Sequence, residues 1–414
     1  MTNILIISEE YLLSTTFELN KIFKYIEKKY SGYARLLKQS TVTPTDFNWC
    51  DVLITIRSNS LFDLELSRLA KKNGKLHILV LDDDLLGLSS NYGRYGVGIW
   101  PQRKKFLRDV LDCTDVVLTS NPLLGEKYTN IGNVKEYVLI NTAITPEDLF
   151  ESKDKVLKDE KIKIVYYVND GSSDMFELYI KPILPELSEK YGNRLSFTLM
   201  ALKPDLTDVK CDMDINCIEH LNFKEFRNFL WKEEFDIGIA PLVKGGFSQY
   251  KYFNKFIEYA IAGIPGIYSE CPPYTYIIKD GVNGVLCGDS SADWYSALCK
   301  LIDNKLLRER IKRNSKEQLK DEFAIEKIVS KLIMDYPQII TFKAPINNCG
   351  VKIYWLQFRR KISILQECCY FARLALHNGG AKLLLVRIYR YFSRLRKSRS
   401  AEKRLKDIKP SDKI

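Results

Sequence analysis

The sequence predicts two doubly wound α/β units in tandem, followed by a basic helical tail. Three observations support this fold class: short apolar runs alternate with amphipathic ones over residues 1–150, a charged stretch follows, and the alternation restarts at residue 162. Strands that are apolar throughout, with helices between them, indicate a parallel sheet covered on both faces. We therefore predict a first domain over residues 1–150, a second over 161–335 and a tail over 337–414.

The predicted strands are brief, rich in Ile, Val and Leu, and bounded by polar or turn residues. In the first unit they are residues 3–8, 51–57, 75–82, 115–120 and 136–141, with a helix at 15–30. In the second unit they are residues 162–168, 195–202, 215–220, 235–242 and 265–269, with helices at 174–191, 222–234 and 252–262. Such sheets bind ligands at the carboxyl ends of their strands, so a cleft between two of them suits a reaction with two substrates.

Composition excludes several classes of protein. A hydrophobic fraction of 46% is that of a globular chain. The first residues, MTNILIISEE, lack a basic segment before the apolar run, so they predict a buried strand and not a signal peptide. No segment offers about 18 uninterrupted apolar residues, as a membrane span requires. Ten scattered Cys without CxxC spacing, and only three His, favour reduced thiols in a cytoplasmic protein over a structural zinc site.

Positive charge is concentrated in the tail. Residues 351–414 hold 17 Lys and Arg against 4 Asp and Glu, whereas the whole chain holds 63 against 52. Residues 381–397 place Leu384 and Ile388 on one side of a helix and Arg387 and Arg390 on the other. This is the composition of an interfacial helix on an anionic membrane; a solvated helix packed on the protein body is the alternative.

We expect the tail to hold the protein peripherally at the inner face of the plasma membrane. A nucleic-acid partner is not expected, because no recognised nucleic-acid motif accompanies the charge.

The richest stretch for function is residues 236–286. A buried strand ends at Pro241, a Gly-Gly loop follows, and a helix is predicted to begin near Ser248, a competent N-cap. Lys251, Lys255 and Glu258 would then share one helical face. A diphosphate would meet the helix N-terminus and the lysines, and Glu258 could accept hydrogen bonds from a vicinal diol. The alternative is an ordinary surface pair between Lys255 and Glu258.

The runs KYFNKFIEYAIAGIPGIYS, YIIKDGVNGVLCG and DWYSALCKLIDNKLLRERIKRNS, in this order, resemble the C-terminal signature of nucleotide-sugar-dependent glycosyltransferases of the GT-B type. More narrowly they resemble the bacterial group 1 enzymes that build surface polysaccharides. The resemblance extends over residues 162–332, and over the N-terminal half it is only architectural. It implies two Rossmann-like domains, with the donor held by the second and the acceptor by the first.

The resemblance also implies roles for particular residues. Glu258 would hold the nucleotide ribose, Lys255 would approach the phosphates, and the backbone of Gly246, Phe247 and Ser248 would lie near the donor sugar. Asn169 and Gly171 would line the site through their amides.

The sequence departs from the family pattern at two points. Tyr250 stands where many members carry a second acid, and the loop of residues 166–175 lacks the Arg that commonly meets the diphosphate. The phosphate-binding cation is therefore open among Lys203, Lys244, Lys251 and Lys255.

A cluster of carboxylates, Asp82 to Asp84, follows a predicted strand of the first unit. Clustered carboxylates could hold a divalent metal. With this architecture no metal and no further cofactor are expected, because a helix dipole and lysines can neutralise a leaving diphosphate. Asp83 or Asp84 is a candidate general base if the enzyme inverts configuration. If it retains configuration, as the resemblance implies, no such base is required.

Arg57 also follows a strand of the first unit. It could bind an acceptor phosphate or face the donor diphosphate, and a surface ion pair is the alternative. His77 lies within a predicted strand and is expected to be a satisfied buried residue.

The expected activity is transfer of a sugar from a UDP-, GDP- or dTDP-type donor to an acceptor hydroxyl of a glycan or lipid-linked acceptor. Two alternatives stay open: a sugar-nucleotide epimerase of related architecture, and a degenerate, non-catalytic relative that serves as a membrane assembly partner.

Overall fold

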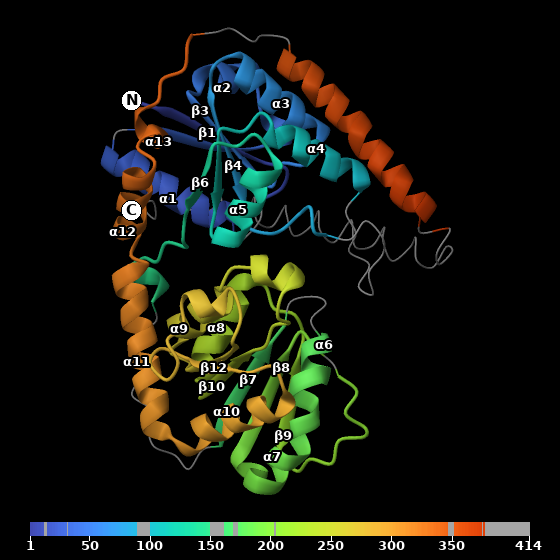
Figure 1. The fold of residues 1–414 in the computed structure, drawn as a ribbon, viewed down its shortest axis with the longest axis vertical. Helices are drawn as coiled ribbons and strands as arrows, with labels where there is room; N and C mark the ends of the chain where they lie inside the picture. The colour runs from blue at the N-terminus through green and yellow to red at the C-terminus, as the bar shows by residue number, and fades with distance from the viewer. Residues whose placement is uncertain are drawn as a thin grey trace. The chain divides into compact units, whose positions relative to one another are not determined.

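The computed structural model describes residues 1–11, 15–30, 32–88, 100–149, 161–168, 173–202, 204–346, 352–374 and 376. The chain forms two compact units (Figure 1). Unit 1 comprises Met1–Ala143 and the chain from Ile325 onwards, and unit 2 comprises Ile144–Ala324. Each unit contains one six-stranded, wholly parallel sheet, so the predicted pair of α/β units is confirmed.

The sheet of unit 1 has the strand order β2-β1-β3-β4-β5-β6. Its strands are β1 (Asn3–Ser8), β2 (Tyr33–Lys38), β3 (Val52–Ile56), β4 (Leu76–Leu81), β5 (Val116–Thr119) and β6 (Glu136–Leu139). The prediction lacks β2, because this edge strand has no fully buried residue and therefore no continuous apolar run.

Two helical layers cover this sheet, and the side chains of β1 alternate between them. The helices are α1 (Thr15–Tyr30), α2 (Pro44–Trp49), α3 (Leu61–Lys72), α4 (Pro101–Leu111), α5 (Pro122–Ile131), α12 (Ile325–Asp335) and α13 (Gln338–Thr341). Ile4 and Ile6 pack in one core cluster with α1 and α12. Leu5 and Ile7 pack in another with α2, α3 and the first turns of a helix at residues 352–374.

The predicted domain boundary at residue 335 differs from the structure, because α12 belongs to unit 1. Ile328, Val329 and Leu332 are buried against the α1 side of the first sheet. Beyond α12, the Thr2 hydroxyl donates to the carbonyl of Ile340 at 2.6 Å. The C-terminal segment is therefore part of the first core and not an appendage of the second.

The sheet of unit 2 has the strand order β12-β11-β10-β7-β8-β9. Its strands are β7 (Ile162–Tyr167), β8 (Leu195–Met200), β9 (Asp214–Ile218), β10 (Ile237–Ala240), β11 (Gly266–Ser269) and β12 (Val285–Cys287). Counted from β7 as the first strand, this is the 3-2-1-4-5-6 order of the Rossmann fold. The short β12, which follows Gly281 and Gly284, is not among the predicted strands.

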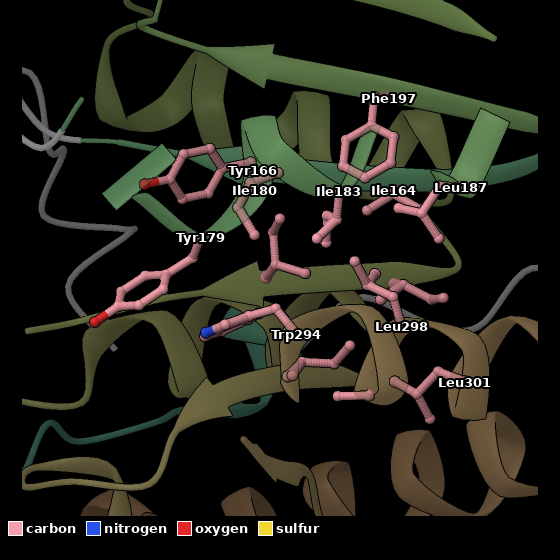
Figure 2. Packing of buried hydrophobic residues seen from close by; sticks show 14 of the residues in the cluster. Ile164, Tyr166, Tyr179, Ile180, Ile183, Leu187, Phe197, Trp294, Leu298 and Leu301 are labelled. Carbon is pink, nitrogen blue, oxygen red and sulfur yellow. The ribbon is translucent and has the colours of Figure 1, made fainter. Parts of the chain in front are cut away.

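The helices of unit 2 pack on both faces of its sheet. They are α6 (Ser173–Met175), α7 (Leu184–Tyr191), α8 (Phe223–Glu233), α9 (Asn254–Ala262), α10 (Ser291–Asp303) and α11 (Lys305–Glu322). The predicted helix 174–191 is interrupted by π and 3₁₀ turns at residues 176–183, next to Pro182 and Pro185, which have no N–H to donate. Figure 2 shows one face, where Trp294 and Leu298 of α10 meet Ile164 and Phe197 of the sheet.

No helix within the described ranges combines the length and the apolar character needed to cross a membrane.

Candidate functional site

The strand order of unit 2 reverses between β7 and β10, and the carboxyl ends of these two strands mark the point where ligands bind in open α/β sheets. After β10 the chain runs through a 3₁₀ turn, Gly246–Tyr250, into α9. The Ser269 hydroxyl at the end of β11 accepts from the amide of Leu242 at 2.8 Å and donates to its carbonyl at 3.1 Å. This anchors the beginning of the loop to the sheet.

The predicted start of the helix near Ser248 is wrong, because Ser248 lies in the 3₁₀ turn and α9 begins at Asn254. Lys251, which follows the 3₁₀ turn, has extended backbone angles. Lys251 therefore precedes the helix and does not share a helical face with Lys255 and Glu258. Its ammonium lies 5.8 Å from the ring centre of Phe247.

Lys255 reaches the carboxyl end of β7. Its Nζ donates to the carbonyl of Tyr167 at 2.5 Å and lies 5.3 Å from the ring centre of Tyr166. Burial, together with the smaller effect of the Lys251 charge, lowers the pKa of Lys255 to about 7, and the charge of Glu258 opposes this shift. The structure thus brings the predicted phosphate-binding lysine to the switch point of the sheet.

Glu258 lies one helical turn after Lys255, and its Oε2 is buried without a hydrogen-bond partner. Burial raises the pKa of Glu258 to about 7, against the charges of Lys255 and Arg227. A buried polar atom without a partner costs about 1–3 kcal/mol. Two hydroxyl donors on a ligand would suit this carboxylate.

The loop before α9 leaves open space around its two glycines. Gly245 and Gly246 have φ of 80° and 57°, and a Cβ at either would meet no atom within 4 Å. Only glycine adopts such angles without strain. The open surroundings suit the predicted approach of a ligand to the backbone of this loop.

Two predicted donor residues, Asn169 and Gly171, lie outside the described residues, as does Lys203. Arg227 on α8 is a residue that no sequence motif marks. It donates to the carboxylate of Asp148 at 3.1 Å and to its carbonyl at 2.7 Å, and its charge acts on Glu258.

In unit 1, Arg57 and the carboxylates meet at the carboxyl ends of β3 and β4. The Arg57 guanidinium donates to Asp82 at 2.6 Å and to Asp83 at 2.7 Å, with a φ of 52° at Arg57. Arg57 therefore makes an ion pair, as the alternative interpretation expects. Asp84 is not in this cluster: it is buried and accepts from Lys127 at 2.7 Å and from the hydroxyl of Tyr128 at 3.1 Å.

His77 is buried, as predicted, with its ring 2.9 Å from the hydroxyl of Thr55. Burial lowers its pKa to about 4.

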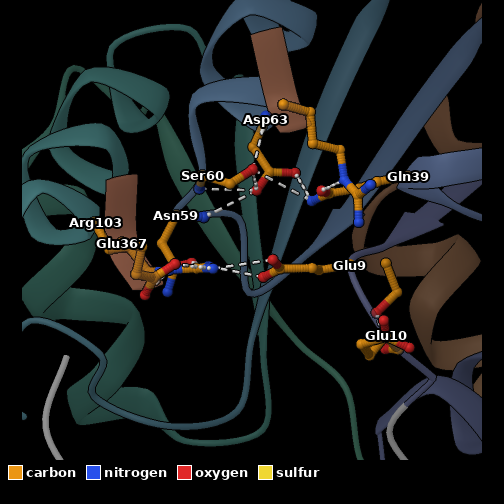
Figure 3. A network of polar contacts seen from close by, with 10 residues as sticks. Glu9, Glu10, Gln39, Asn59, Ser60, Asp63, Arg103 and Glu367 are labelled. Atoms are coloured by element: carbon orange, nitrogen blue, oxygen red, sulfur yellow. Dashed lines mark hydrogen bonds and ion pairs between the residues drawn. The ribbon is translucent and has the colours of Figure 1, made fainter. Parts of the chain in front are cut away.

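A further polar cluster, which no sequence motif marks, lies in unit 1 where the strand order reverses between β1 and β3. Arg103 of α4 donates to Glu9, to Asn59 and to Glu367 of the helix 352–374 at 2.7–2.9 Å (Figure 3). Burial would raise the pKa of Glu9, but Arg103 holds it below its usual value. Nearby Asp63 accepts from Ser60 and Gln39, and its burial raises its pKa to about 6. These partners lie far apart in the chain, so no local pattern reveals them.

Solved structures similar to this chain over most of its length were found. HepE from Anabaena, in complex with UDP, matches with a TM-score of 0.54 at 10% identity, over 82% of this chain and 100% of that one. A sucrose-phosphate synthase from Thermosynechococcus elongatus matches with a TM-score of 0.58 at 10% identity and the same coverage. A glycosyltransferase from Rickettsia africae matches with a TM-score of 0.51 at 12% identity, over 82% of this chain and 99% of that one.

These structures have the GT-B fold, so the predicted fold type is confirmed. Neither the comparison with protein-family models nor the search of curated proteins gave a match.

Proposed function

We propose that the protein is a glycosyltransferase that takes a sugar from a nucleotide-diphosphate donor bound by unit 2. One observation carries this proposal: the carboxylate of Glu258, with a buried and unpartnered Oε2, stands one turn from Lys255 at the switch point of a Rossmann-type sheet. An acceptor for ribose hydroxyls and a cation for the diphosphate are the two groups that a nucleoside diphosphate requires. The similar HepE structure contains UDP, which makes a uridine nucleotide the first to test.

In the proposed reaction, the bond between the sugar C1 and the diphosphate oxygen breaks, and a bond from C1 to the acceptor oxygen forms. Negative charge grows on the leaving diphosphate. Protonated Lys255 and the N–H groups of the loop at Gly246–Ser248 would stabilise that charge. The proton of the acceptor hydroxyl passes to the leaving phosphate if configuration is retained.

We propose retention and independence from metal for two reasons. The Asp83 carboxylate is paired with Arg57, and that of Asp84 with Lys127, so neither is free to act as a base. The same pairs already neutralise the carboxylates that a cation would otherwise bind. Unit 1 would bind the acceptor, a hydroxyl of a glycan or lipid-linked precursor of a surface polysaccharide.

The proposal also includes a cytoplasmic location at an anionic membrane surface, supported by the basic composition of the tail. The predicted interfacial helix at residues 381–397 lies outside the described residues.

The test is ligand-induced thermal stabilisation of the full chain by UDP, GDP and dTDP. The cognate nucleotide at 100 times its dissociation constant should add about 2.7 kcal/mol to the free energy of unfolding. Glu258→Ala should remove most of this gain, whereas Glu309→Ala, at an exposed position on α11, should keep it. No stabilisation by any of the three would overturn the proposal, and conversion of a nucleotide sugar without an acceptor would favour an epimerase.

A further inference from the structure

The helix at residues 352–374 has an inner face that is fixed to unit 1. Ile353 and Leu356 are buried in the core cluster of α2 and α3. Arg360 donates to the Gln39 side chain at 3.2 Å, and Glu367 accepts from Arg103 at 2.7 Å. The orientation of the helix on unit 1 is thereby determined, and its opposite face is turned to solvent.

That opposite face carries a continuous apolar stripe. Tyr354, Trp355, Phe358, Ile362 and Leu365 are 63%, 57%, 54%, 43% and 65% exposed. Their spacing of three and four residues places them along one side of the helix, and a helix rises 1.5 Å per residue, so the stripe is about 17 Å long. Figure 1 shows this helix at the edge of unit 1, beside α3 and α4. A large contiguous apolar patch of this kind marks an interaction site.

The charged side chains that the helix itself places beside the stripe are positive, and one of them, Arg359, lies 3.6 Å from the Glu65 carboxylate of α3. At 100° per residue, Lys352 and Arg359 border one edge of the stripe and Lys361 borders the other. The single acid of this helix, Glu367, lies on the inner face and is neutralised by Arg103. A partner with an apolar interior and a negatively charged surface therefore fits this face.

We infer that this stripe is a docking surface for an anionic lipid bilayer, on which the helix lies parallel to the membrane plane. Trp and Tyr favour the interface of a bilayer, and flanking Lys and Arg meet its anionic headgroups. A second copy of this chain would bring a like-charged stripe. Residues 377–414 of the two copies would also repel one another, because this segment holds 12 Lys and Arg against 3 Asp and Glu. The lipid-binding role of the stripe does not depend on the proposed function. Only its purpose rests on that function, since docking would bring the enzyme to a lipid-linked acceptor.

The experiment measures co-sedimentation of the full chain, without nucleotide, with vesicles of phosphatidylcholine and of phosphatidylcholine mixed with phosphatidylglycerol. The wild type should bind the mixed vesicles, with a blue shift of Trp fluorescence and weaker binding at high salt. The triple variant Trp355→Ser/Phe358→Ser/Leu365→Ser should bind at least about tenfold more weakly, because three apolar side chains no longer enter the bilayer. A matched control, Leu306→Ser/Met334→Ser, changes side chains that are 84% and 72% exposed and should bind like the wild type.

The variant Lys352→Glu/Lys361→Glu tests the charges separately. It should weaken binding to the mixed, anionic vesicles and leave binding to pure phosphatidylcholine vesicles unchanged. Equal binding by the wild type and the triple variant would overturn the inference. So would a dimer of the wild type that the triple variant abolishes, without any dependence on lipid. A cooperative thermal transition seen by circular dichroism shows that each variant is folded. Absence of nucleotide binding by the wild type would therefore count against the proposed function and leave the lipid result interpretable.

Discussion

At the scale of single residues, Lys255 and Glu258 are opposite charges buried at one point of the second sheet. Burial disfavours the charged form of both, so it lowers the pKa of Lys255 and raises that of Glu258, each to about 7. The pair therefore titrates near neutral pH, where a ligand that supplies both an anion and hydroxyl donors would stabilise both charges.

This pair predicts opposite pH dependences in two variants. In Glu258→Gln, affinity for a nucleotide sugar should fall as pH rises toward 7, because Lys255, without the Glu258 charge that raises its pKa, loses the proton that attracts the diphosphate below about pH 7. In Lys255→Met, affinity should instead rise as pH rises above 7, because Glu258, without the Lys255 charge that lowers its pKa, ionises above about pH 7 and becomes a better acceptor. Calorimetric titration with UDP-glucose measures both, since its diphosphate is esterified at both ends and lacks the phosphate pKa of about 6. Parallel slopes in the two variants would contradict these roles.

The other candidate residues show how neighbours decide a role. Asp83 and Asp84 are adjacent in the sequence, yet Asp83 pairs with Arg57 while Asp84 turns inward to Lys127 and Tyr128. Sequence reasoning located the cluster at a strand end but could not separate the two carboxylates, because their partners come from different elements.

At the scale of elements, the helix 352–374 is joined to unit 1 through Arg103. This guanidinium is 16% exposed and lies between Glu9 and Glu367, so its removal would leave two carboxylates without their cation, next to Asp63. Breaking a buried pair by removing one partner typically costs about 3–5 kcal/mol.

Arg103→Met should therefore lower the free energy of unfolding by about 3 kcal/mol and increase amide hydrogen exchange across residues 352–374. Arg68→Met, at an exposed ion pair on α3, should change stability by less than about 1 kcal/mol. Chemical denaturation and hydrogen exchange give both readouts. Unchanged exchange in Arg103→Met would mean that the apolar contacts of Ile353 and Leu356 hold the helix by themselves.

At the scale of the whole molecule, unit 2 is continuous in sequence and unit 1 is not. The two ends of unit 2 meet, since the amide of Ile144 donates to the carbonyl of Phe323 at 2.7 Å. Unit 1 needs both ends of the chain, because α12 supplies buried residues to its sheet.

Two fragments test this division. Residues 144–324 alone should unfold cooperatively and keep the stabilisation by nucleotide, because both core clusters of unit 2 lie within them. Residues 1–143 alone should lack a cooperative transition, since the side of their sheet that α1 and α12 cover together would lose the buried residues of α12. Joining residue 143 to residue 325 by a short glycine linker should restore that transition, measured by circular dichroism. A cooperative transition in 1–143 alone would refute the role given to α12.

The sequence by itself determined the fold class, ten of the twelve strands in the described part of the chain and the neighbourhood of Lys255 and Glu258. It could do so because buried parallel strands are continuous apolar runs, and because the segment from β10 to β11 is local in the chain. The two missing strands, β2 and β12, are an exposed edge strand and a three-residue strand, which leave weak patterns.

Only the tertiary structure decided to which unit the C-terminal helices belong, where α9 begins and which charged residues form pairs. The contacts of α12 with α1, and of Glu367 with Arg103, join residues that are hundreds of positions apart. The apolar stripe on the helix 352–374 also depends on tertiary packing, because both faces of that helix carry apolar residues and only its contacts with α2 and α3 show which face is left exposed.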